Sequence, residues 1–110
     1  MIVVVSEVWP HPARLADYLE LSAELRKHLA ELDGFVSSER FESCTEPGKF
    51  VSVSIWRDEE SLARWRNHEE HRVIMAKGRD GIFRDYHIRV ASVTRDYSMN
   101  NRSGAPLDSQ

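Results

Sequence analysis

Cysteine is nearly absent from this chain, since Cys44 is the only one among 110 residues. A single cysteine cannot form an internal disulfide, and without a CxxC pair no cysteine set could hold a structural zinc ion. Cys44 lies in the turn-like stretch SCTEPGK, with no neighbouring histidine to activate its thiol. We therefore expect a cytoplasmic protein that needs neither a disulfide nor zinc to fold.

Long apolar runs and an excess of one charge are also missing. The opening MIVVV is apolar for only five residues before Ser6 and Glu7, too short for a membrane span or a signal-peptide core. The 15 Lys and Arg residues face 18 Asp and Glu residues, which argues against the concentrated basic surface that nucleic acids require. We expect one globular domain without a membrane or nucleic-acid partner.

The first half of the chain alternates between strand-like and helix-like periodicity. The β-branched opening predicts a strand over residues 2–9, which the prolines of WPHP terminate. Apolar residues then recur every three or four positions and predict a helix over 12–32, ended at Gly34, a residue suited to a left-handed cap. Two further strands, 35–42 and 49–56, flank the Pro-Gly turn of TEPGK and predict a hairpin.

The second half predicts a broken helical segment and a last strand. Asp58 can cap a helix whose first turn is acidic, and the pattern restarts at Asn67, a second candidate cap. The alternating stretch 83–97 predicts a long final strand. The polar residues 98–110 have no periodic apolar positions, so we expect a domain over 1–97 followed by a tail that could order on a partner subunit.

The element order β-α-β-β-α-β is typical of a ferredoxin-like α+β domain, with a four-stranded antiparallel sheet and both helices on one face. The other face would be bare. Both faces carry large apolar groups, because Val3 and Val5 alternate with Ile2 and Val4 on the first strand. An exposed apolar sheet of this size is typical of an interaction surface, so we expect a homodimer that pairs its sheets.

One stretch carries a resemblance to a known family. The strand ending SIWRDEESLARWRNHEEH and the closing DYHIRVASVTRDY are similar to the antibiotic biosynthesis monooxygenase family of dimeric α+β barrel proteins. The most specific feature is the W-x2-H-x2-H spacing of Trp65, His68 and His71, and the resemblance covers residues 2–97. It implies a small dimer with an apolar pocket between sheet and helices. Some members oxidise aromatic polyketides with dioxygen and no cofactor, whereas others bind and degrade haem.

The haem-degrading branch fits this sequence poorly. The resemblance implies an iron-ligating histidine nine or ten positions after the helix tryptophan, where this chain has Met75 and Ala76. It also implies an asparagine near the end of the first strand, where this chain has Ser6 and Glu7. A thioether is a weaker ferric ligand than imidazole, and an ionised carboxylate cannot donate a hydrogen bond. Haem is therefore disfavoured as a cofactor.

Cofactor-free oxygenation of a small aromatic or quinone-like substrate has simpler requirements. The protein must hold a planar molecule in a dry pocket, remove one proton and stabilise the resulting oxyanion. Histidine accepts a proton near neutral pH, so His71 is the first candidate base and Trp65 its partner in the pocket. The remaining predicted pocket residues, which supply aromatic walls, a second base or oxyanion donors, are Trp56, Asn67, His68, Phe83, Tyr86 and Arg89.

Each candidate also has a structural interpretation. Trp65 could be a core residue, and His71 could be hydrogen-bonded structurally. Asn67 and His68 are better explained by the break between two helical pieces. Arg89 could face a dimer interface, because a period of two does not reveal which face is which.

A metal site and a binding function without chemistry are two alternatives to oxygenation. The HxxH spacing lacks a third ligand on the same face, so no metal site is predicted. The chain could also be a dimeric ligand-binding or stress-response module without chemistry.

Overall fold

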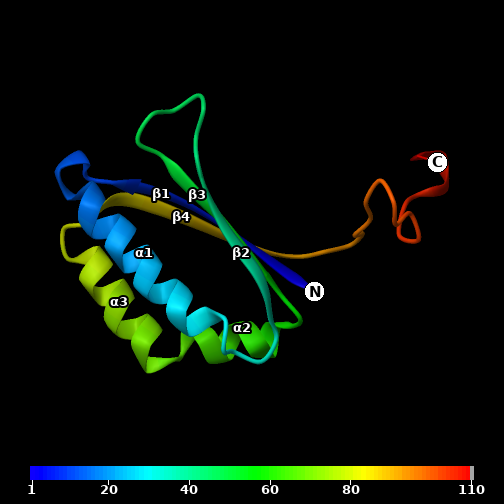
Figure 1. Ribbon diagram of the computed structural model, residues 1–110, viewed down its shortest axis with the longest axis horizontal. Coiled ribbons are helices and arrows are strands. Elements are labelled where there is room, and N and C mark those ends of the chain that lie inside the picture. The colour runs from blue at the N-terminus through cyan, green and yellow to red at the C-terminus, as the bar shows by residue number, and fades with distance from the viewer. Residues whose placement is uncertain (110) are drawn as a thin grey trace.

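The computed structural model describes residues 1–109. Within these residues one antiparallel sheet has the strand order β2-β3-β1-β4, and the helices lie together on one of its faces (Figure 1). The predicted ferredoxin-like α+β fold is confirmed. The elements are β1 Ile2–Pro10, α1 Leu15–Leu29, β2 Phe35–Glu42, β3 Phe50–Trp56, α2 Glu59–Arg66, α3 Glu69–Arg79 and β4 Phe83–Ser92, with 3₁₀ turns at Pro12–Arg14 and Leu107–Ser109.

Helix boundaries differ from the predictions by a few residues. The first helix was expected over 12–32, but Pro12–Arg14 forms a separate 3₁₀ turn and α1 ends at Leu29. The break between α2 and α3 lies where the pattern restarts, although the cap of α3 is His68 rather than Asn67. His68 Nδ1 accepts a hydrogen bond from the backbone N–H of Glu70 at 3.2 Å.

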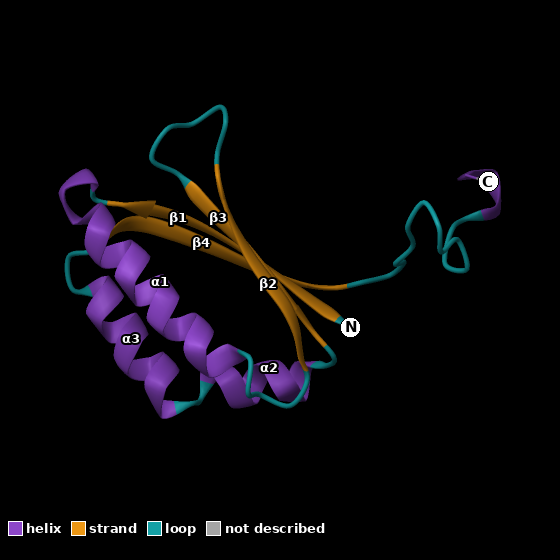
Figure 2. Ribbon diagram, viewed as in Figure 1, coloured by secondary structure: helices purple, strands orange, loops and turns teal. Residues whose placement is uncertain are grey.

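The last strand is shorter than predicted, and its pairing with β1 ends at Ser92. Ile2, the first residue of β1, pairs with Ser92, and the N–H of Val93 donates to the Met1 carbonyl at 3.0 Å. Beyond that point the chain runs away from the sheet as loop (Figure 2). The predicted strand end at Tyr97 is therefore wrong. Gln110, in the predicted tail, lies outside the described residues.

The core lies between the sheet and the helices, in two clusters of buried side chains. Trp56 and Trp65 belong to the first cluster, and Tyr18 and Phe50 belong to the second. Trp56 is 1% exposed, and its indole Nε1 donates to Ser54 Oγ at 3.0 Å, so its polar atom has a partner. The two clusters leave a space between them, which is the site described below.

The far face of the sheet combines apolar side chains with one ion cluster. Lys49 and Arg89 both bind the carboxylate of Glu7, the lysine at 2.5 Å, and these hydrogen bonds hold the pKa of Glu7 at about 2. Half-buried apolar residues surround this cluster: Val3, Val5, Val51, Val53 and Ile55. None of the helices within residues 1–109 is long and apolar enough to cross a membrane.

Candidate functional site

A cavity of about 270 Å³ lies between the helices and the sheet. It exists because the helix-facing side of the sheet carries small side chains in its middle. Val4 pairs with Ser54 there, and Ser6 pairs with Ser52. A serine side chain fills far less space than an aromatic ring, so this region stays hollow. Large buried pairs close the sheet at both ends: Ile2 with Trp56 and Val8 with Phe50.

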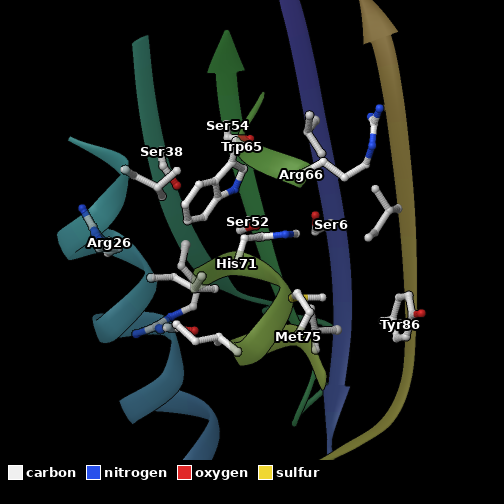
Figure 3. A pocket seen from close by; sticks show the side chains of 18 of the residues that line it. Ser6, Arg26, Ser38, Ser52, Ser54, Trp65, Arg66, His71, Met75 and Tyr86 are labelled. Atoms are coloured by element: carbon white, nitrogen blue, oxygen red, sulfur yellow. The ribbon is translucent and has the colours of Figure 1, made fainter. Parts of the chain in front are cut away.

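The break between α2 and α3 shapes the opposite wall. Trp65, on the last turn of α2, is 7% exposed, and His71 on α3 lies against it with 4.8 Å between ring centroids. Both side chains point into the cavity, as does Met75 one turn after His71 (Figure 3). The structure thus brings the two predicted catalytic residues together at one wall.

His71 has the properties of a proton acceptor. Its Nδ1 is buried and makes no hydrogen bond of ordinary geometry within residues 1–109, although a contact with the backbone of Arg66 opposes the effect of burial on the pKa of the ring. Burial lowers the pKa of His71 from its ordinary value of 6.5, because desolvation disfavours the charged imidazolium. The ring is therefore neutral at pH 7, with one nitrogen able to take up a proton.

Aromatic residues of the strands complete the apolar lining. Trp56 lies in the cavity wall at the end of β3, and Phe83 and Tyr86 line it from β4 with 6.0 Å between their ring centroids. Tyr86 is 41% exposed because β4 is the edge strand and no helix covers its outer side.

Three predicted pocket residues do not line the cavity. Asn67 donates through Nδ2 to the Ala63 carbonyl at 2.8 Å and accepts from Arg72 at 2.8 Å, so both ends of its amide have structural partners. His68 caps α3. Arg89 lies on the far face with Glu7, opposite the helices. The two predicted oxyanion donors, Asn67 and Arg89, are thus misplaced, which corrects their assignment to the pocket.

Polar residues that the sequence reasoning missed line the cavity instead. The serines of FVSVSIW alternate with valines, so Ser52 and Ser54 share one face, and Ser6 is the cross-strand neighbour of Ser52. The alternation of serine and valine is visible in the sequence. It does not show which of the two faces of the strand meets the helices. Three arginines also line the cavity: Arg26, Arg40 and Arg66.

The residues present give little support for haem or a metal ion. Met75 lies in the cavity wall and Ala76 is exposed, so the positions that the haem-degrading branch would use for its ligand carry no imidazole. Within residues 1–109 there is no group of three His, Cys, Asp or Glu side chains arranged to hold a metal ion.

Comparisons with known proteins give the family and the fold. A family model described as antibiotic biosynthesis monooxygenase matches residues 1–77. "Jasmonate monooxygenase ABM" of Pyricularia oryzae is 43% identical over 100 residues, which cover 91% of this chain and 46% of that protein. The chain thus spans about half the length of this relative.

Two solved structures share the architecture. SnoaB of Streptomyces nogalater, described as a cofactor-independent oxygenase and solved as the mutant N63A, is 15% identical with a TM-score of 0.76 over 86% of this chain and 94% of its own. Rv0793 of Mycobacterium tuberculosis is 18% identical with a TM-score of 0.80 over 88% and 98% of the two chains. At these identities the likeness establishes the fold alone.

Proposed function

The chain belongs to the antibiotic biosynthesis monooxygenase family, and from this premise we propose that it oxidises a small aromatic or quinone-like molecule with dioxygen and no cofactor. The observation that carries the proposal is the half-buried His71, which is tilted against Trp65 in the wall of an apolar cavity. A neutral imidazole that lines the cavity can accept the proton that such a reaction removes.

The chemistry balances without an external reductant when the substrate supplies the electrons. In an anthrone, the ring methylene becomes a carbonyl, one oxygen atom of O₂ enters that carbonyl, and the other leaves as water. His71 takes the proton whose loss forms the electron-rich anion, and that anion reduces dioxygen. The hydroxyls of Ser6 and Ser52 stand on the cavity floor as donors to the oxyanion, and the aromatic walls exclude water.

Oxygen uptake with anthrone as the probe tests this function. We expect protein-dependent consumption of one O₂ for each anthraquinone formed, with one atom of ¹⁸O₂ in the product and the other in water. Protein heated beyond unfolding serves as the control for autoxidation. Uptake that does not exceed this control contradicts oxygenation of this class of substrate. Binding of anthrone without turnover would instead favour a ligand-binding module.

Jasmonate is a second candidate substrate, because a relative with 43% identity carries that word in its name. It is an apolar carboxylate of a size suited to a small cavity. Hydroxylation of a saturated carbon consumes two electrons beyond those of the substrate, so this reaction requires an added reductant. Product formation from jasmonate only when a reductant is supplied would favour this candidate over anthrone-type oxidation.

We also propose that two copies pair through the far face of the sheet. Replacing Val53 by Asp places a charge in the middle of the half-buried apolar residues of that face, so we expect a monomer where the wild type is a dimer. Sedimentation-velocity ultracentrifugation measures the change in mass. The matched control is Val73→Asp on α3, where the side chain is 46% exposed and the dimer should persist. A monomeric wild type would contradict the proposal.

A further inference from the structure

The cavity has an unbalanced positive charge. Arg26, Arg40 and Arg66 line it, whereas no Asp or Glu of the described chain does. Resting on the proposed small-molecule function, we propose that the ligand is an apolar carboxylic acid whose carboxylate is bound by Arg26 and Arg40. We call these two arginines, on the β2 side of the cavity, the anion anchor. The aromatic walls alone do not supply a group that binds an anion.

Arg40 stands at the end of a polar row that crosses the sheet. It pairs with Ser52 on β3, and Ser52 pairs in turn with Ser6 on β1. The side chain reaches from β2 toward α1, because its guanidinium carbon lies 5.7 Å from the centroid of the Tyr18 ring. Hydrogen-bond donors therefore continue from the β2 edge to the middle of the cavity floor.

Arg26 faces this row from the helix side. Tyr18, Ser22 and Arg26 follow one another at four-residue spacing on α1, and all three line the cavity. Arg26 and Arg40 also border the adjoining groove along β2, so they lie where the cavity meets the surface. Both residues thus border one groove at the β2 edge, with the guanidinium of Arg40 beside Tyr18 and Arg26 two helical turns further along α1.

Neither arginine is neutralised by a carboxylate of the described residues. The nearby Arg57, by contrast, binds Asp33 at 3.0 Å. Glu39 borders the same groove as the two arginines, but alternation along β2 turns its side chain to the far face, opposite Val53, and it forms no salt bridge with either of them. Cations without an acidic partner beside an apolar space are available to an anionic ligand, although Arg40 also contacts the ring of Tyr18.

A carboxylate is the anion that best matches this arrangement. It offers two oxygens in the plane that guanidinium groups recognise, and serine hydroxyls can donate to it as well. Its apolar body would extend away from the anchor toward Trp65 and His71, which lie between Arg26 on one side and Tyr86 on the other (Figure 3). The anchor would thus set which carbon of the substrate reaches the base.

Equilibrium binding of 2-naphthoate and its uncharged methyl ester tests the anchor by isothermal titration calorimetry. For the wild type we expect the acid to bind about tenfold more tightly than the ester, the loss expected when a charge-assisted contact is removed. Arg40→Gln and Arg26→Gln should each reduce this preference, with unchanged affinity for the ester. Lys27→Gln, which removes the same charge from the next residue of α1 outside the cavity lining, should retain it.

Several results would overturn the anchor. The wild type could bind acid and ester with equal affinity, or bind neither, and either result contradicts the anchor. A loss of the preference in Lys27→Gln equal to that in the two arginine variants also contradicts it. If Arg40→Gln loses ester binding as well, Arg26→Gln decides the matter, and a preference for the acid that is unchanged in Arg26→Gln rejects the proposal. Because no turnover is measured, failure of the anchor is distinct from failure of oxygenation, which the oxygen-uptake assay reports.

Discussion

Replacing His71 by Gln is expected to lower the rate of anthrone-dependent oxygen consumption by about 10²- to 10⁴-fold, the usual contribution of a positioned general base. Glutamine approximates the size of the imidazole and keeps polar atoms at the wall, but it cannot accept a proton near neutral pH. An oxygen electrode with saturating anthrone measures the effect on kcat. The contact with Trp65 and the fold should persist, which circular dichroism checks.

The control for this substitution is His11→Gln. His11 is exposed beyond the end of β1 and does not line the cavity, so its loss should leave the rate unchanged. Full activity of His71→Gln would remove His71 from the mechanism while leaving the cavity as a binding site. Equal losses in both variants would indicate a general effect of losing a histidine rather than loss of a base.

The same assignment predicts the direction of the pH dependence. Burial lowers the pKa of His71 from 6.5, and only the neutral ring accepts a proton. We therefore expect kcat/KM to fall on acidification, as the imidazole becomes protonated, with the midpoint of that fall below pH 6.5. A rate that rises on acidification would contradict a neutral base.

Replacing Gly34 by Ala is expected to lower the free energy of unfolding by about 3 kcal/mol, at the upper end of ordinary single substitutions. Gly34 has φ of 89°, a conformation that costs any other residue energy. A Cβ there would also lie 1.9 Å from Oγ of Ser61. Ser61 is 1% exposed and donates to Asp58 Oδ1 at 2.6 Å, so it cannot move without disturbing the cap of α2.

Gly48→Ala provides a matched control for the backbone contribution. Gly48 has a similar φ of 83°, but a Cβ there meets nothing within 4 Å. The free energy of unfolding of this variant should therefore fall only by what the left-handed conformation costs an alanine, about 1 kcal/mol. Urea denaturation of both variants measures the difference. Equal losses would show that Ser61 adjusts to the added methyl group and that the contact is unimportant.

The order of the elements could be predicted from the sequence because each periodicity is contained within a single segment. The alternation in FVSVSIW indicates a strand, and the break near Asn67 separates α2 from α3 without reference to the rest of the chain. Exact ends were harder to predict, because the end of β4 depends on where β1 begins. Trp65 and His71 were expected together in the pocket and both line the cavity, while their catalytic role stays a prediction.

Only the tertiary structure decided which side of the sheet meets the helices. Alternation along a strand is symmetric between its two faces, so the sequence alone left Arg89 as a candidate donor and gave no place to Ser6 and Ser52. Folding puts Arg89 with Glu7 on the far face and the serines on the cavity floor. Folding also brings Arg40 of β2 against Tyr18 of α1. This contact depends on strand register and on helix packing, which no local pattern in the sequence predicts.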